Sequence, residues 1–549
     1  MSSRIKKIVL LILKLADIML SYLMVPLQVQ KGITAARKLG RRKVLAALFD
    51  GQFNAYEEIS RNTELIISAL KRANIDHIVF KRLDQTVSIA VIDSADRSLE
   101  AVQALDLEGY YYETHRDKNN SRIGRLASRL PKRVGSIRAI SFYRHLTTDG
   151  ARAVNGKPYQ VTLEFWTSFK HSGSGTVQRV MDEFGISDKQ ALKGALIASI
   201  GNDIARIFAP DTQKRSTTKI YGKNYPTLQI FKEKLLAEVT FPIDIVYTWV
   251  DGSDPLWLEK YEEHRRLEDP NYSNNSMSRY SDHDELRHSL RSAEMYAPWV
   301  RNIYIVTMGQ RPKWLKKSSG KVKIIDHKDV FTDPSVLPVF NSHAIETQLH
   351  HIDGLSEHFL YLNDDILFTN MTRPSDFFFA NGVARVQPSS AQIGTGNPVP
   401  GEVAPSSAGK NARKLLKKEL SVYITDKFRH VPHPQIKTAS QDIERVFSRL
   451  VASTMKSRFR DPSDIPFTSI LSQSYLLGSG KGVPAPIHTR TINISDRGSV
   501  KALLDLERDP ECKTVCINEG TDRVDRDVIT ERMSRYLGSN FPFKSRYEI

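Results

Sequence analysis

The stretch HFLYLNDDILF, His358 to Phe368, decides how the larger part of the chain folds. Five residues suited to a buried strand are followed at once by Asn363, Asp364 and Asp365, and the chain then turns apolar again. Polar side chains directly after a core strand are typical of a parallel sheet, because ligands bind beyond the carboxyl ends of its strands. The two adjacent carboxylates therefore predict a functional site at this edge.

The surrounding sequence extends this pattern over residues 241–380. Short apolar strands alternate with amphipathic helices, in the order IDIVYTWV, DELRHSLRSAEMYA, NIYIVTM, VKIID, SHAIETQLHHIDGL and HFLYLN. The alternation predicts an α/β fold with a Rossmann-like parallel sheet and helices on both faces. Asp251 follows the first strand and should share one edge with Asp364 and Asp365. We assign residues 241–549 to this catalytic domain and expect a last strand, Lys513 to Asn518, to join the same sheet.

Two other segments differ from this domain in composition. Residues 51–240 predict an accessory α+β domain in which no catalytic group of residues stands out, with one helix over NTELIISALKRANI that Asn62 or Thr63 would cap. Residues 381–408 are rich in Pro, Gly and Ser, which predicts a loop or linker. The role of the accessory domain does not follow from the sequence.

The N-terminal 50 residues concentrate positive charge. They hold ten Lys and Arg against two Asp, which is +8 of the net +17. Ile8 to Leu27 is apolar apart from a narrow stripe that carries Lys14 and Asp17. This predicts an amphipathic helix lying on an anionic membrane, as in a cytoplasmic protein held peripherally at the inner face of the plasma membrane. A true membrane span and a helix packed on the protein itself are the alternatives.

Composition sets the remaining limits. The chain has 549 residues, 40% hydrophobic and 26% charged, which is enough for two or three globular domains. Its two cysteines, Cys512 and Cys516, favour a reducing compartment and two buried thiols. We expect no nucleic-acid partner, because the sequence has neither a zinc finger nor an aromatic RNA-binding signature.

The carboxylate pair suits a divalent cation. Mg²⁺ or Mn²⁺ is typically held by one or two carboxylates together with substrate phosphates, so Asp364 and Asp365 predict a metal site. The alternative is that the pair caps a turn or binds an arginine. Arg287 and Arg291 lie one helical turn apart, where they would contact a phosphate or form surface salt bridges. Gly252, after Asp251, predicts a tight turn with a close backbone approach.

Three longer stretches resemble the Stealth family of bacterial exopolysaccharide phosphotransferases and animal GlcNAc-1-phosphotransferases. They are IDIVYTWVDGSDP, SRYSDHDELRHSLRSAEMYAPWVRNIYIVTMGQRPKWL and FNSHAIETQLHHIDGLSEHFLYLNDDILF. The resemblance continues through HVPH (residues 430–433), FRDPSDIPF (459–467) and CINE (516–519) to FPFKSRYE, so that all four family regions occur in order. His283 stands where the second region often has Asn, which leaves its role open.

The resemblance implies a reaction and a set of site residues. A sugar 1-phosphate would pass from a nucleoside diphosphate sugar, first of all a UDP-sugar, to a hydroxyl of a glycan acceptor, and UMP would leave. Asp364 and Asp365 resemble the metal-binding and catalytic carboxylates, and His433 and Arg460 resemble active-site residues. The donor-binding residues implied by the motifs are Asp251, Gly252, Arg279, Glu285, Arg287, Arg291 and Asn518.

Two questions stay open at this level. Either His433 or Asp365 suits the role of general base, with His430 the weaker candidate. The alternative functions are a metal-dependent glycosyltransferase that releases UDP and a non-enzymatic protein that binds membranes or polyanions. The second alternative leaves the Asp364–Asp365 pair without a purpose.

Overall fold

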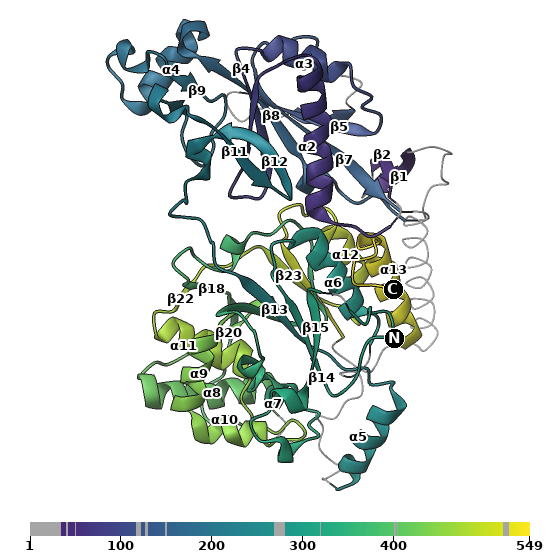
Figure 1. Cartoon of the computed structure of the whole chain (residues 1–549). Coiled ribbons are helices and arrows are strands. Elements are labelled where there is room, and N and C mark those ends of the chain that lie inside the picture. Colours follow the sequence, from purple (N-terminus) through teal and green to yellow (C-terminus); the bar gives the residue numbers. More distant parts are fainter. Residues whose placement is uncertain are drawn as a thin grey trace, which may run out of the picture. The chain divides into compact units, whose positions relative to one another are not determined.

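The computed structural model divides into two compact units, residues 1–235 and 236–549, each of which is described by itself (Figure 1). The structure describes residues 34–39, 42–49, 51–116, 122–126, 130–148, 151–267, 280, 282–318, 320–399, 402, 404–519 and 526–549. The predicted amphipathic helix at residues 8–27 lies outside these ranges. Within them, no helix combines the length and the apolar character needed to cross a membrane.

The first unit is built around a mixed sheet. Its elements are β1 (Thr34–Leu39), β2 (Arg42–Leu48), α2 (Ala55–Arg72), β3 (His77–Lys81), β4 (Val87–Ile92), α3 (Ala95–Gln103), β5 (Tyr110–Arg116), β6 (Arg122–Leu126), β7 (Ile137–Thr147), β8 (Val161–Ser168), α4 (Ser174–Phe184), β9 (Leu196–Ile197), β10 (Ile207–Phe208), β11 (Arg215–Ile220) and β12 (Lys223–Leu228). The main path of the sheet runs β1-β2-β7-β8-β4-β3. Helix α2 packs on β4 and β8.

Two sequence-based boundaries in this unit differ from the structure. Strands β1 and β2 lie inside the segment predicted to associate with membranes, and β2 pairs in parallel with β7. Helix α2 begins at Ala55, and Asn54 caps it by accepting hydrogen bonds from the backbone N–H groups of Tyr56 and Glu57. The predicted caps are therefore wrong: Asn62 lies inside the helix and donates its side-chain amide to the carbonyl of Tyr159, 2.8 Å away.

The second unit contains the predicted parallel sheet. Its elements are β13 (Ile243–Thr248), α5 (Pro255–Leu267), α6 (Glu285–Tyr296), β14 (Ile303–Thr307), β15 (Val322–Asp326), α7 (Ser342–Glu346), the short 3₁₀ helix η10 (Leu349–His351), β16 (His358–Asn363), β17 (Ile366–Phe368), β18 (Ala384–Val386), β19 (Pro388–Gln392), α8 (Ala404–Leu420), β20 (Asp426–Phe428), β21 (His433–Ile436), α9 (Lys437–Val446), α10 (Ser448–Met455), α11 (Ser472–Gly478), β22 (Gly482–Pro484), β23 (Thr489–Asn493), α12 (Ser499–Leu506), β24 (Thr514–Asn518) and α13 (Arg526–Asn540).

The five strands of the main sheet lie in the order β15-β14-β13-β16-β21. The first four run parallel, and β21 is antiparallel to β16. Both faces are covered. Val246 packs in one core cluster with Leu349 and Met455, while its neighbour Tyr247 hydrogen-bonds Ser289 of α6. Because successive strand residues point to opposite faces, these contacts place covering elements on both sides of the sheet.

Two predictions for this unit need correction. Strand β24 does not join the main sheet; it pairs with β17 and β23 in a separate three-stranded sheet. The predicted loop at 381–408 contains β18 and β19 and the start of α8. Strand β18 pairs with β22 and β19 with β20, partners that local composition cannot reveal.

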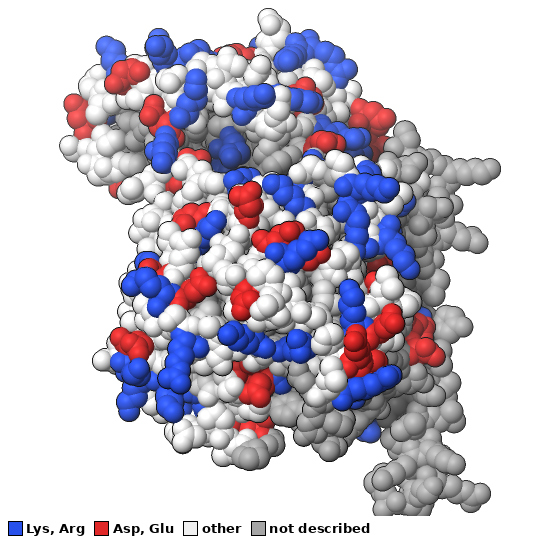
Figure 2. Space-filling model, turned by 60° about the horizontal axis from the view of Figure 1, so that its bottom comes forward, with Lys and Arg blue, Asp and Glu red and all other residues white. Residues whose placement is uncertain are grey.

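One face of the molecule carries mixed charge. On the face drawn in Figure 2, Lys and Arg side chains lie among Asp and Glu side chains rather than in one basic patch. A non-specific polyanion-binding face would gather basic residues on one side. The polyanion-binding alternative stays a prediction, because much of the basic N-terminal segment lies outside the described residues.

Candidate active site

The carboxyl ends of β13 and β16 are aligned by their register. Thr248 at the end of β13 pairs with Asn363 at the end of β16, so the residues that follow both strands meet at one edge. Asp251 lies three residues after the first of these positions, and Asp364 comes directly after the second. The prediction that these carboxylates share an edge of the sheet is confirmed.

A cavity of about 160 Å³ opens at this edge. Asn363, Asp364 and Arg460 supply polar groups to its wall, and most of the remaining wall is apolar or aromatic. The further lining residues are Thr248, Trp249, Val250, Trp257, Tyr280, Met308, His327, Val339, Phe340, Ser342 and Ile345. Polar groups that converge beside aromatic side chains suit a site for a small molecule.

Acidic side chains crowd together beside this cavity. Burial raises the pKa of Asp364 well above its usual range, and the charges of Asp365 and Asp282 raise it further. Burial likewise raises the pKa of Glu285, with added repulsion from Asp364 and Asp282. The pKa of Asp282 is raised by burial and by the charges of Asp284 and Asp251. Mutual repulsion of this kind is relieved by a bound cation.

The carboxylates also offer free oxygen atoms. Oδ1 of Asp365 is buried without a hydrogen-bond partner among the described residues, and so is Oδ1 of Asn518. Oxygen ligands that are not already saturated fit the requirements of Mg²⁺ or Mn²⁺. The donor set of Asp364, Asp365 and their acidic neighbours therefore suits a hard divalent cation.

Asp365 is held by the neighbouring three-stranded sheet. Its carbonyl accepts a hydrogen bond from the backbone N–H of Ile517, and its Oδ2 accepts one from the thiol of Cys516 at 3.3 Å. The same thiol lies 3.0 Å from Nδ1 of His430, whose Nε2 lies 3.0 Å from the side-chain amide of Asn363. Both cysteines are buried and free, as predicted, but no local pattern indicates that Cys516 contacts Asp365.

Gly252 makes the close approach that its position predicts. Its N–H donates to the carbonyl of Tyr280 at 3.0 Å, and a Cβ at this position would lie 2.3 Å from that oxygen. Asp251 closes the same turn by accepting hydrogen bonds from the backbone and side chain of Ser253. The turn brings Tyr280 into the cavity wall.

Arg287 and Arg291 do not line the cavity. Both bind Glu548, near the C-terminus: Nε of Arg287 lies 2.6 Å from Oε2, and Arg291 makes a two-point contact at 2.8 and 2.7 Å. Arg291 also donates to the carbonyl of Phe541. Glu548 therefore contacts both guanidinium groups, and the expected contact of these arginines with a donor phosphate stays a prediction.

Three further predicted residues have these positions. Arg460 contacts the cavity and donates to Oγ of Ser342 at 2.7 Å. His433 is 3% exposed, and burial together with nearby His430 lowers its pKa to about 3, so its imidazole is neutral. Arg279 lies outside the described residues. His283, whose role the sequence left open, joins two regions by contacting Glu519 and Thr530.

Comparison with known proteins identifies three conserved regions. Stealth protein conserved region 1 matches residues 241–266, region 2 matches 279–386, and region 3 matches 429–476. The motif CINE, interpreted above as part of a fourth region, stays a prediction. The matched regions contain Asp251, Glu285, Asp364, His433 and Arg460.

Curated relatives extend the similarity over most of the chain. An exopolysaccharide phosphotransferase of Streptomyces coelicolor is 32% identical over 90% of this chain, which spans 51% of that relative's length. A second one from the same organism is 31% identical over 89% of this chain and 82% of its own length. Mycobacterium tuberculosis has a relative of the same name with 33% identity, over 64% of this chain and 66% of its own.

Among solved structures, the galactosyltransferase LgtC in complex with donor and acceptor sugar analogues matches with 13% identity and a TM-score of 0.26. The match covers 54% of this chain and 96% of that one.

Proposed function

The chain belongs to the Stealth family, and we propose that it is an exopolysaccharide phosphotransferase. In this proposal it moves a sugar 1-phosphate from a nucleoside diphosphate sugar, first of all a UDP-sugar, to a hydroxyl of a glycan acceptor. The observation that carries the proposal is the crowd of acidic side chains around Asp364, beside a cavity that also contains Arg460. Such a site combines ligands for a cation with a positive charge for a phosphate.

We interpret the main sheet as Rossmann-like, which supports this assignment. Its parallel strands, numbered along the chain, lie in the order 3-2-1-4, with β13 as the first strand. In sheets of this kind, ligands bind in the crevice outside the carboxyl ends of the strands. The cavity beside Asn363 and Asp364 has that position.

In the proposed reaction, an acceptor hydroxyl attacks the phosphorus atom that bears the sugar. The new bond joins the acceptor oxygen to this phosphorus, the bond to the bridging oxygen between the two phosphates breaks, and UMP leaves. Asp364 and Asp365 would hold Mg²⁺ or Mn²⁺, which neutralises charge on the diphosphate. Arg460 would stabilise charge on the phosphoryl oxygens. The aromatic wall that includes Trp249 and Tyr280 offers a flat surface for the donor.

Two groups can take the proton from the acceptor. The imidazole of His433 is in its neutral form, and its Nδ1 has no hydrogen-bond partner in the described part of the chain. Asp365 lies two residues after β16, and its Oδ1 has no hydrogen-bond partner in the described part of the chain. A pH–rate profile separates them, because replacing the base removes the acidic limb of the profile, whereas replacing the other group leaves that limb in place.

Resolving the nucleotide products tests the reaction. The protein would be incubated with Mg²⁺, a panel of UDP-sugars and short glycan acceptors. Acceptor-dependent UMP is the expected result, because it requires cleavage between the two phosphates. Acceptor-dependent UDP would overturn the proposal in favour of a glycosyltransferase, since the sugar–oxygen bond would then have broken.

We also propose that the basic N-terminal segment holds the protein at an anionic, cytoplasmic membrane face. The support is the charge of residues 1–50 and the apolar stretch from Ile8 to Leu27. Sedimentation with vesicles should show binding to phosphatidylglycerol, little binding to phosphatidylcholine, and weakening with salt. Equal binding to both lipids would contradict an electrostatic attachment. Replacing Lys6, Lys7 and Lys14 with Gln should weaken the interaction.

A further inference from the structure

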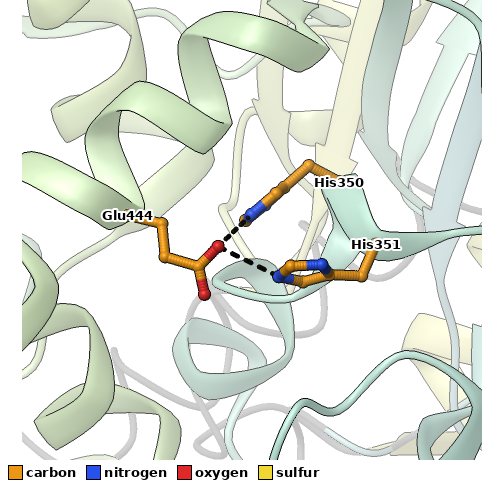
Figure 3. A group of neighbouring side chains, drawn as sticks. All are labelled: His350, His351 and Glu444. Atoms are coloured by element: carbon orange, nitrogen blue, oxygen red, sulfur yellow. Dashed lines mark hydrogen bonds and ion pairs between the residues drawn. The ribbon is translucent and has the colours of Figure 1, made fainter.

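Three side chains from two separate elements converge in the second unit, at a place that the proposed reaction does not use. His350 and His351 end the 3₁₀ helix η10, and Glu444 lies on α9 (Figure 3). Nε2 of His350 lies 2.8 Å from Oε2 of Glu444, and Nε2 of His351 lies 3.0 Å from the same oxygen. One nitrogen of each ring therefore points at one carboxylate (Figure 3).

The two histidines are held in this orientation by their surroundings. His350 is 1% exposed and stacks on Phe467, with ring centroids 5.8 Å apart and an interplanar angle of 11°. The rings of His350 and His351 lie 4.2 Å apart. Nδ1 of His350 is buried and has no hydrogen-bond partner among the described atoms. Of the two nitrogens of the buried His350 ring, Nε2 contacts Glu444 and Nδ1 makes no hydrogen bond within the described residues.

Charge and access both suit a metal ion. The carboxylate of Glu444, which both imidazole rings face, supplies negative charge for a cation. The side chains of His351 and Glu444 are 30% and 28% exposed, so solvent reaches the point where the three ligand atoms meet. Lys437 is the nearby charged group that opposes a cation, and Glu444 offsets it.

We propose that His350, His351 and Glu444 form a Zn²⁺ site, separate from the site of phosphoryl transfer. Two imidazole nitrogens and one carboxylate oxygen are a zinc donor set that leaves a fourth position for water. With bonds of about 2.0–2.2 Å, tetrahedral geometry separates ligand atoms by about 3.3 Å. The two nitrogen–oxygen separations of 2.8 and 3.0 Å need to open only slightly. All three ligand atoms lie within 4.8 Å of one another. None of the three residues lines the cavity at Asp364.

The position of the site would let a bound metal join two elements of the second unit. Element η10 lies just before β16 in the chain, and α9 lies just after β21. Strands β16 and β21 are neighbours in the main sheet. A metal that bound η10 to α9 would therefore secure the strands that carry Asp364 and His433. Binding to the folded state alone would raise its stability.

Cobalt titration of the full-length, untagged, metal-free protein tests the proposal. Co²⁺ bound by nitrogen and oxygen in a tetrahedral site gives intense visible absorption without a sulfur-to-cobalt charge-transfer band in the near ultraviolet. That band identifies the other possible group in the described chain, Asp365, His430 and Cys516. We expect one Co²⁺ with visible absorption and no charge-transfer band, displaced by Zn²⁺, and a Tm that rises with added Zn²⁺.

Variants at the exposed ligands complete the test. His351→Ala and Glu444→Gln should each weaken Zn²⁺ affinity by more than about tenfold, because loss of even outer-shell partners has an effect of that size. His488→Gln is the matched control, since His488 pairs with Asp509 and lies outside the cluster. Zn²⁺ binding that survives in both ligand variants, or the absence of visible Co²⁺ absorption, would overturn the proposal. In the latter case the three side chains form only a hydrogen-bonded group.

Discussion

At the scale of single residues, the raised pKa of Asp364 indicates a place where a cation would bind. Its carboxylate lies beside other acidic groups that raise its pKa. For a carboxyl group whose pKa is higher in the folded than in the unfolded state, folding stability falls as the pH rises from the unfolded pKa toward the folded one. At neutral pH this carboxyl group thus destabilises the metal-free protein, and a bound cation, which favours the carboxylate form, would reverse the effect.

Replacing Asp364 with Asn should therefore separate activity from stability. We expect nucleotide release to fall by about 100-fold or more, the size of effect seen when one preorganised electrostatic group is removed. The Tm of the metal-free protein at pH 7 should rise, because a neutral amide replaces a carboxyl group whose pKa is raised on folding. Thermal melts between pH 5 and 8, with and without Mg²⁺, measure this.

The matched control for this variant is Asp505→Asn, a surface carboxylate that pairs with Arg508. Activity and Tm should change little, since exposed pairs contribute about 0–1 kcal/mol. If Asp364→Asn kept full activity, Asp364 would have no role in catalysis.

The close contact between Gly252 and Tyr280 predicts that a larger residue at position 252 is not tolerated. A methyl group at this position meets the carbonyl of Tyr280 at 2.3 Å, so Gly252→Ala must displace the turn that supports the cavity wall. We expect a loss of about 1–3 kcal/mol in the free energy of unfolding and a strong loss of activity. Urea unfolding and nucleotide release measure the two effects.

Gly538→Ala is the control for that substitution. Gly538 lies in α13, and a Cβ there meets nothing within 4 Å, so the change should stabilise the protein slightly or leave it unaffected. Equal stability and activity in both variants would show that the turn at Gly252 tolerates a side chain.

At the scale of elements, helix α6 is fixed by the end of the chain. Arg287 and Arg291 both bind Glu548, whose side chain is 1% exposed. The two guanidinium groups outweigh burial and lower the pKa of Glu548 to about 2. This contact stabilises the fold above the unfolded pKa of Glu548, and its contribution is lost as the pH falls through about 2.

Glu548→Gln should consequently destabilise the protein by about 3–5 kcal/mol, because it removes the carboxylate that faces the buried guanidinium of Arg291, whereas Arg287 keeps its contact with Asp284. Urea unfolding at pH 7 gives the value. Glu531→Gln breaks an exposed pair with Arg535 one helical turn away and should change the free energy of unfolding by less than about 1 kcal/mol. Similar effects of the two substitutions would contradict the anchoring role of Glu548.

At the scale of the whole molecule, the chain separates into two units at Leu235 and Leu236. Lys232 and Lys234 are exposed just before this boundary, and Leu236 is almost fully exposed. A short exposed connection between compact units is a preferred site of proteolysis.

Limited digestion with trypsin should therefore cut after Lys232 or Lys234 and leave a stable fragment of the second unit. Mass spectrometry identifies the cut, and circular dichroism shows whether the fragment stays folded. Replacing both lysines with Gln should slow this cleavage. Complete degradation without a stable C-terminal fragment would show that the second unit depends on the first.

Local sequence determined much of the second unit. The apolar strand from His358 to Asn363 and the carboxylates after it were predictable, because burial and side-chain periodicity act over a few residues. The shared edge followed from the rule that parallel strands end together, and the register of Thr248 with Asn363 confirms it. The close approach at Gly252 was also readable, since few other residues fit such a turn.

Only the tertiary structure decided which distant residues meet. Arg291 binds Glu548, which lies 257 positions further along the chain. Cys516 contacts Asp365, which lies 151 positions before it, and Glu444 lies 94 positions after His350. Strand β24 pairs with β17 instead of the main sheet for the same reason. The periodicity of apolar residues predicts that a side chain is buried, but it does not predict which side chain it packs against. That choice depends on packing and charge neutralisation between segments far apart in the chain, which no local pattern encodes.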